Sequence, residues 1–131
     1  MPSAVVEIRR SYSPEDEAYL LESVHDAIVR AFKVDAAYRN VTLIVHQAHR
    51  FLGRTDCQKP EWLTNVSIYL PPGRSVDAKR KLYRFITEAF SVVGIPPDSV
   101  LIRLVELPAE NFGVRGDQAL CDVDLGYSVN V

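Results

Sequence analysis

Hydrophobic residues in the first fifty positions follow two different spacings. Residues 4–8 (AVVEI) form a short, β-rich run that predicts a strand. Ser13 has the character of a helix N-cap, and Asp16 completes an approximate capping box. Apolar residues then recur every three or four positions as far as Lys33, which predicts an amphipathic helix with the stripe Leu20, Leu21, Val24, Ile28, Ala31 and Phe32. Residues 41–45 (VTLIV) predict a buried strand.

The second half of the chain repeats this order. Residues 66–70 alternate apolar and polar side chains, as a strand does, and the Pro-Pro-Gly segment at residues 71–73 ends the run. Ser75 is the N-cap of a second predicted helix, whose apolar stripe is Leu82, Phe85, Ile86, Ala89, Phe90 and Val93. Gly94 stands where a C-terminal cap is expected, and residues 100–107 supply a closing strand.

The elements of the two halves have nearly the same spacing. The N-caps Ser13 and Ser75 lie 62 positions apart, and the closing strands at Val41 and Val100 lie 59 positions apart. Any α/β domain alternates in this way, but the near-constant offset favours two tandem β-α-β units with right-handed crossovers. The predicted fold class is α/β, a four-stranded sheet with two helices on one face. The other face needs a cover, which favours self-association.

One domain is expected to span the chain. Unit one is predicted at about 1–50, a linker at about 51–63, unit two at about 64–107, and a C-terminal loop and edge strand at 108–131. The edge strand is predicted over 125–131, where the pattern alternates, and such a strand could pair with a neighbouring chain.

Composition and charge exclude several classes of partner. The 131 residues are 47% hydrophobic and 24% charged with a formal net charge of −2, which excludes binding to nucleic acid or a membrane surface through bulk charge. Cys57 and Cys121 are too few for a disulfide scaffold and badly spaced for a zinc site. Apolar runs are too short for a bilayer span, and no signal peptide is recognised. We therefore expect a cytoplasmic protein without a metal.

Pro2 is the first candidate for catalysis. An initiator methionine before proline is ordinarily removed, which leaves a rigid secondary amine at the start of a strand. An α-amino group titrates near about 7.7–8.0, and apolar burial or cationic neighbours lower that pKa. A neutral amine near pH 7 is a competent general base.

Arginines are the next candidates. Arg74 immediately precedes the N-cap Ser75, which predicts a guanidinium beside the unpaired amides of a helix start, a natural carboxylate site. A solvated arginine in a turn is the alternative. Arg39 and Arg103 are further cationic candidates. Arg103 lies within an apolar strand and needs either a site or a partner, such as a salt bridge with Glu106.

A glycine-punctuated loop, residues 111–116 (NFGVRG), follows the last long strand, and Phe112 is a candidate pocket wall there. Together with Met1-Pro2 and Pro-Gly-Arg-Ser at 72–75, this loop ahead of Leu-Gly-Tyr resembles the tautomerase superfamily. That group includes 4-oxalocrotonate tautomerase, malonate semialdehyde decarboxylase, the 3-chloroacrylic acid dehalogenases and macrophage migration inhibitory factor. The resemblance covers nearly the whole chain and implies a homotrimer.

The resemblance also implies roles for single residues. Pro2 matches the catalytic proline, and Arg74 matches the arginine that binds substrate carboxylate in several subgroups. Phe112 matches the aromatic residue that lines the pocket near the proline. Thr64 lies 62 positions after Pro2 and matches its duplicate, but it carries no terminal amine. One proline-based site per chain is therefore expected.

The sequence departs from the family pattern at several positions. Leu101 and Thr42 stand where 4-oxalocrotonate tautomerases place an additional arginine. Tyr38 precedes Arg39 where decarboxylases use an aspartate, and the nearest carboxylate is Asp35. Prolines replace the second arginine that dehalogenases and decarboxylases keep before Gly-Arg-Ser. These departures favour proton shuttling over water activation, with Tyr38 able to polarise or protonate a carbonyl.

The expected function is a cofactor-independent isomerase, a keto–enol tautomerase acting on a small 2-oxo or 2-hydroxydienoate-type carboxylic acid. Pro2 and Arg74 are the expected catalytic residues. The expected substrate-binding residues are Tyr38, Arg39, Arg103 and Phe112. Malonate semialdehyde decarboxylase-like or hydratase/dehalogenase activity on the same proline is one alternative. A non-catalytic trimeric binding module is the other, and it applies if Met1 is retained.

Overall fold

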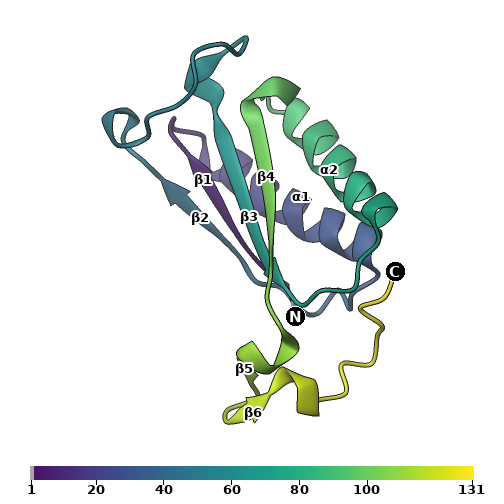
Figure 1. Ribbon diagram of the computed structural model, residues 1–131. Helices are drawn as coiled ribbons and strands as arrows, with labels where there is room; N and C mark the ends of the chain where they lie inside the picture. Colours follow the sequence, from purple (N-terminus) through teal and green to yellow (C-terminus); the bar gives the residue numbers. More distant parts are fainter. Residues whose placement is uncertain (1) are drawn as a thin grey trace.

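The computed structural model describes residues 2–131, and Met1, whose removal is predicted above, lies outside the described residues. The strands of the main sheet are β1 (Ser3–Ile8), β2 (Val41–Val45), β3 (Thr64–Leu70) and β4 (Val100–Glu106) (Figure 1). The two α-helices are α1 (Pro14–Phe32) and α2 (Val76–Ser91). Each predicted helix and sheet strand is therefore found within a few residues of its expected position. The prediction that residues 41–45 are buried is wrong, because β2 is an edge strand in which Ile44 and Val45 are exposed.

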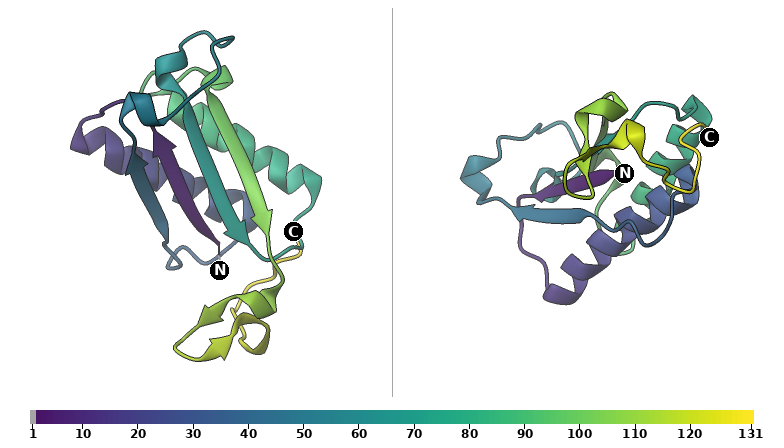
Figure 2. Two further views of the ribbon diagram at one scale, coloured as in Figure 1. Left: turned by 60° about the vertical axis from the view of Figure 1, so that its left-hand side comes forward. Right: turned by 90° about the horizontal axis from the view of Figure 1, so that it is seen from below.

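Strand pairing confirms the tandem arrangement. The order in the sheet is β2-β1-β3-β4, in which β1 pairs in parallel with β2 and β3 pairs in parallel with β4. The two units meet at the centre of the sheet through the antiparallel pair β1–β3. Both helices lie on one face of the sheet, as predicted (Figure 2).

The ends of the helices follow the sequence signals. The hydroxyls of Ser13 and Ser75 each accept a hydrogen bond at 3.1 Å from the backbone amide three residues later. This satisfies one otherwise unpaired amide at each helix start. Gly94 lies just beyond α2 in the left-handed region, with φ of +97°, where a residue with a Cβ is strained.

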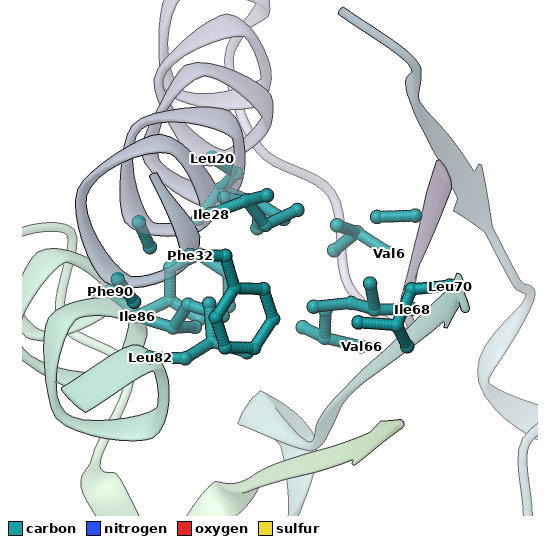
Figure 3. Close-up of a cluster of buried hydrophobic side chains, with 14 of the residues drawn as sticks. Val6, Leu20, Ile28, Phe32, Val66, Ile68, Leu70, Leu82, Ile86 and Phe90 are labelled. Carbon is teal, nitrogen blue, oxygen red and sulfur yellow. The ribbon is translucent and has the colours of Figure 1, made fainter. Parts of the chain in front are cut away.

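The hydrophobic core lies between the two helices and the inner face of the sheet (Figure 3). Alternate residues of the central strands point into it, and the helices contribute their apolar stripes. Its fully buried side chains include Val6, Ile8, Val66, Ile68, Leu70, Leu20, Phe32, Leu82, Ile86 and Phe90. Burying one such side chain contributes about 1.5–3 kcal/mol, so the core holds the two units firmly together.

The outer face of the sheet is open in the single chain. Ile44, Tyr69 and Leu101 are 44%, 37% and 51% exposed, and the strand register puts all three on this face. We call these three residues the open-face patch.

The C-terminal segment corrects one prediction. Residues 125–131 form no strand; the strands after β4 are the short pair β5 (Gly113–Val114) and β6 (Gln118–Ala119). Side chains near the end of the chain bond the local backbone instead. Asp124 accepts from the Gly126 amide and Ser128 accepts from the Asn130 amide, at 2.9 and 3.1 Å. Such local bonds compete with a strand ladder, which alternation alone does not reveal.

Within residues 2–131, neither helix combines the length and the hydropathy that crossing a membrane requires.

Candidate active site

The start of β1 places Pro2 in a recess at one end of the sheet. Pro2 is buried and lines a cavity of about 190 Å³ with residues 37–40, which precede β2. The Ala4 amide donates a hydrogen bond of 2.9 Å to the carbonyl of Asn40 and so fixes this loop against β1. An amine is easier to keep neutral in such a buried position than in water.

Arg74 lies at the same end of the sheet. The antiparallel register of β1 and β3 places Pro2 beside Leu70. The Nη1 atom of Arg74 donates a hydrogen bond of 3.0 Å to the carbonyl of the next residue, Pro71. The guanidinium carbon lies 5.2 Å from the ring centre of Phe32, in the last turn of α1. The predicted carboxylate-binding arginine and the predicted catalytic proline therefore share one region.

The guanidinium of Arg74 is buried and only partly satisfied. Arg74 is 6% exposed, and its Nε and Nη2 atoms have no hydrogen-bond partner among residues 2–131. Burial lowers the pKa of Arg74, and this effect is opposed by Tyr127 and Glu106. The alternative of a solvated turn arginine is wrong. A buried cation with free donors is costly, and it is typical of a group that binds an anion.

The C-terminal segment ends beside the segment that joins β3 to α2 (Figure 1), which contains Arg74. The Ser75 amide donates a hydrogen bond of 2.8 Å to the carbonyl of Val131. A Cβ on Gly73, whose φ is +136°, would lie only 2.9 Å from the carbonyl oxygen of Val129. A glycine is therefore required for this close approach. The helix start that was expected to meet substrate directly is instead partly covered by the chain itself.

Tyr38 and Arg39 both line the Pro2 cavity, as the prediction requires, but each side chain has another partner. The Tyr38 hydroxyl donates a long hydrogen bond of 3.4 Å to the carbonyl of Leu125, and its ring lies 5.8 Å from that of Tyr127. Arg39 is exposed and forms an ion pair with Glu22 of α1. Tyr38 thus fastens the C-terminal segment at the edge of the recess.

The other two candidates lie away from the recess in the single chain. Arg103 is on the open face of β4, where its Nε atom donates a hydrogen bond of 2.9 Å to the Ser67 hydroxyl. The alternative of a salt bridge between Arg103 and Glu106 is wrong, because Glu106 pairs with Lys79. Phe112 directly precedes the β5–β6 hairpin and is not among the residues that line the cavity.

The second unit has its counterpart region filled by large side chains. Thr64, the duplicate of Pro2, is fully buried at the start of β3 and donates a hydrogen bond to the Trp62 carbonyl. The guanidinium of Arg10 lies 3.7 Å from the centre of one Trp62 ring, and Tyr12 packs edge-on against the indole. This packing accords with the expected single site per chain, which stays a prediction.

The polar groups gathered near Pro2 are hydrogen-bond donors rather than metal ligands. Among residues 2–131, no group of three or more His, Cys, Asp or Glu side chains could hold a metal ion. A guanidinium with free N–H groups suits an acceptor with several oxygens, above all a carboxylate.

A family model described as "Tautomerase enzyme" matches residues 38–115, more than half of the chain. The chain belongs to the tautomerase family. This confirms the resemblance seen in the sequence, and the matched segment contains Arg74 and Phe112. No curated protein matches the sequence.

Solved structures of other tautomerase-fold proteins are similar along most of the chain. A malonate semialdehyde decarboxylase superposes with a TM-score of 0.79 at 22% identity, covering 88% of this chain and 92% of the other. A native fused 4-OT gives 0.81 at 20% identity, covering 92% and 98%. A fused 4-OT described as an asymmetric trimer gives 0.80 at 22% identity, covering 92% and 97%. At these identities the likeness establishes the fold.

Sequence reasoning missed Tyr127 as a residue of this region. Its hydroxyl is buried without a hydrogen-bond partner among residues 2–131, and it lies close enough to Arg74 for the two to interact electrostatically. The only signal was the Leu-Gly-Tyr segment within the family resemblance. Nothing in its spacing indicated that the segment folds back over the turn after β3.

Proposed function

We propose that this tautomerase-family protein catalyses keto–enol isomerisation of a small 2-oxo or 2-hydroxydienoate-type carboxylic acid without a cofactor. Pro2, freed of Met1, is the general base, and Arg74 binds the substrate carboxylate. The Pro2 recess and Arg74 lie at the same end of the sheet, within a chain that belongs to the tautomerase family.

The unsatisfied guanidinium of Arg74 is the observation that carries this proposal. Two of its nitrogens are buried without a protein acceptor among residues 2–131. A group of this kind is retained at a cost to folding, and a bound carboxylate offsets that cost by accepting both hydrogen bonds. The same positive charge stabilises the negative charge that develops on the enolate oxygen.

The proposed reaction needs only a proton transfer between two atoms of the substrate. The neutral Pro2 nitrogen takes the proton from the enol hydroxyl, and the electron pair of that O–H bond forms the carbonyl. The former double bond then takes a proton at carbon from the charged Pro2 amine. Pro2 returns to its neutral form, so no oxidant or co-reactant is required.

The test measures ketonisation of phenylenolpyruvate and of 2-hydroxymuconate. Pro2→Ala and Arg74→Ala are each expected to lose most activity. General acid–base catalysis contributes about 10²–10⁴-fold, and removing one donor to a developing oxyanion costs about 10²–10³-fold. Pro97→Ala and Arg80→Ala are the matched controls, because both residues are exposed and neither lines the Pro2 cavity. Full activity in the Pro2 and Arg74 variants refutes the mechanism.

The state of the Pro2 nitrogen is tested by an intact-mass measurement on the protein as the cell makes it. Loss of Met1 is expected, because a peptide bond at the proline nitrogen would abolish its basicity. A native protein that retains Met1 favours the alternative of a non-catalytic binding module.

Decarboxylation of a short 3-oxo acid on the same proline is the second candidate. The structural similarity to malonate semialdehyde decarboxylase supports it. Against it, Asp35, the carboxylate nearest in sequence to the Tyr38-Arg39 pair, already accepts the Ala37 amide at 2.9 Å. Release of carbon dioxide from malonate semialdehyde, without ketonisation of the enols, would establish this candidate in place of the first.

A homotrimer is also proposed, together with a role for Arg103 and Phe112 in substrate binding across chain boundaries. The open-face patch leaves apolar side chains exposed, and similar fused 4-OT structures are described as trimers. Such an assembly would cover the sheet face on which Arg103 lies.

A further inference from the structure

Three buried hydrogen-bond donors, in the turn after β3 and in the C-terminal segment beside it, lack an acceptor within residues 2–131. Two are the Nε and Nη2 atoms of Arg74, and the third is the hydroxyl of Tyr127. Arg74 and Tyr127 lie within electrostatic reach of each other. A bound carboxylate accounts for the two arginine donors, which leaves the phenol without a role in the proposed reaction.

The position of Tyr127 is well determined by the contacts around it. On one side its ring lies 5.8 Å from Tyr38, a residue of the Pro2 cavity. On the other side, the residues that follow Tyr127 are held by the 2.8 Å hydrogen bond between the Ser75 amide and the Val131 carbonyl. Tyr127 also lines a second cavity of about 420 Å³, which Pro71 and Pro72 border. Tyr127 therefore stands between the Pro2 recess and the turn that carries Arg74.

Tyr38 and Tyr127 differ in what their hydroxyls do. Tyr38 was expected to polarise a carbonyl, but its hydroxyl already donates to the carbonyl of Leu125. Of these two hydroxyls, only that of Tyr127 is buried without a partner among the described residues. Burial raises the pKa of Tyr127 even though Arg74 opposes the change, so the phenol remains a protonated donor at neutral pH.

We propose that the Tyr127 hydroxyl donates a hydrogen bond to the oxygen on the carbon next to the substrate carboxylate, and so selects 2-oxo and 2-hydroxy acids. This inference rests on the proposed function, since it takes the carboxylate to be bound by Arg74. A guanidinium fork and a neighbouring phenol together match three acceptor oxygens, two of the carboxylate and one on the adjacent carbon. A 3-oxo acid places its carbonyl one carbon farther from the carboxylate and loses this contact.

Binding tests the inference without relying on catalysis. Pyruvate and propionate share a three-carbon chain and a carboxylate, but only pyruvate has an oxygen on carbon 2. Calorimetric titration of the wild-type protein is expected to show a preference for pyruvate of about five- to tenfold, the usual net effect of one hydrogen bond. Tyr127→Phe is expected to lose that preference while still binding both acids. Tyr83→Phe, which removes an exposed phenol on α2, is expected to keep it.

Kinetic measurements provide a second test of the role of Tyr127. Tyr127→Phe is expected to lower kcat/KM for phenylenolpyruvate by about tenfold, whereas Tyr83→Phe leaves it unchanged. If wild type ketonises the enol, Pro2→Ala does not, and Tyr127→Phe equals wild type in both assays, then the proposed function holds and the role of Tyr127 is overturned. If Pro2→Ala and Arg74→Ala are fully active, the proposed function itself fails.

The role of Tyr127 can be tested even if Tyr127→Phe does not fold. Should the melting temperature show that Tyr127→Phe is unfolded, the comparison of pyruvate with propionate on the wild-type protein decides alone. Equal affinity for the two acids overturns the assignment, and a clear preference for pyruvate supports it.

Discussion

Arg74 shows how strongly burial changes the meaning of a residue. In the sequence it is one arginine before a helix N-cap, whereas in the fold it is 6% exposed, with two nitrogens that have no hydrogen-bond partner among residues 2–131. Within the described part of the chain, only Nη1 has a protein acceptor, the carbonyl of Pro71, and the guanidinium also lies over the ring of Phe32. Such an arrangement costs stability, and the proposed binding of a carboxylate would explain why it is kept, a trade-off common at functional sites.

Arg74→Met therefore tests both the stability cost of the buried guanidinium and its proposed role in ligand binding. Replacing a buried, partly unsatisfied cation by an apolar side chain of similar length is expected to raise the free energy of unfolding by about 1–2 kcal/mol. Activity on phenylenolpyruvate is expected to disappear in the same variant. Urea unfolding without ligand measures the first effect. Arg80→Met, at an exposed position of α2, is expected to change stability by less than about 0.5 kcal/mol. A strongly destabilised Arg74→Met would mean that the guanidinium is structural.

Two tyrosines are expected to make the fold sensitive to high pH. Burial raises the pKa of Tyr12 and of Tyr127 above the ordinary value of 10.0. Above pH 10 the unfolded chain has lost protons that the native chain keeps, so the free energy of unfolding falls as pH rises. The slope contributed by each tyrosine is at most about 1.4 kcal/mol per pH unit.

Urea unfolding at a series of pH values between about 9 and 11 measures this decline. The double variant Tyr12→Phe/Tyr127→Phe is expected to decline less steeply than wild type. Tyr83→Phe removes one exposed phenol and is expected to follow the wild-type slope. Identical slopes for the double variant and wild type would contradict the assignment to these two phenols.

The candidate site could be predicted from the sequence only where its signals are local. Pro2 and the Gly-Arg-Ser turn are short motifs, and the structure brings them to one end of the sheet. The ion pair of Arg39 with Glu22 and the packing of Tyr38 on Tyr127 join residues far apart in the chain. No periodicity encodes such contacts, so Tyr127 and the placement of residues 125–131 over the Arg74 turn (the covering segment) could be found only in the fold.

At the scale of elements, the sequence predicted the structure correctly where burial requires a regular spacing of apolar residues. The prediction failed where side chains hydrogen-bond to the local backbone. Both helices and all strands of the main sheet follow an apolar stripe or alternation packed against one core. The segment 125–131 also alternates, yet it forms no strand. Its side chains bond their own backbone, and Val131 bonds the Ser75 amide beyond the sheet. Alternation predicts a strand only where a neighbouring strand is available to pair.

The covering segment can be displaced without touching the reacting groups. A Cβ at Gly73 would meet the carbonyl oxygen of Val129 at 2.9 Å, so Gly73→Ala must push the segment away from Arg74. Gly116→Ala is the matched control, since its φ of +92° is also positive but nothing lies within 4 Å of the added carbon. Both variants are expected to lose about 1 kcal/mol of stability from backbone strain.

Gly73→Ala and Gly116→Ala are expected to differ in catalytic activity. Gly73→Ala should lower kcat/KM for phenylenolpyruvate by about tenfold, because Arg74 and Tyr127 lose their relative placement and water reaches the guanidinium. Gly116→Ala should remain close to wild type. Equal activity in the two variants would show that the covering segment plays no part in the site.

At the scale of the whole molecule, the two faces of the sheet differ in whether other elements cover them. The inner face is closed by both helices, whereas the outer face carries the open-face patch without a cover (Figure 2). Charged residues are interspersed there as hydrogen-bonded pairs. Arg103 bonds Ser67, and Glu7 lies 2.9 Å from His46. An apolar face whose polar groups are already satisfied loses little by being buried, which is the property of a protein–protein interface.

Leu101→Lys therefore tests the assembly of the molecule. Leu101 is 51% exposed on β4, and a lysine there would have to lose its hydration if a second chain covered the sheet. Analytical ultracentrifugation is expected to give three times the chain mass for wild type and a lower mass for the variant. Val92→Lys changes an even more exposed apolar residue just after α2, away from the sheet, and should leave the mass unchanged. A wild-type mass of a single chain would show that the open face stays uncovered in solution. In that case Arg103 could not reach a recess of another chain, and the site would be limited to Pro2, Arg74 and the residues around them.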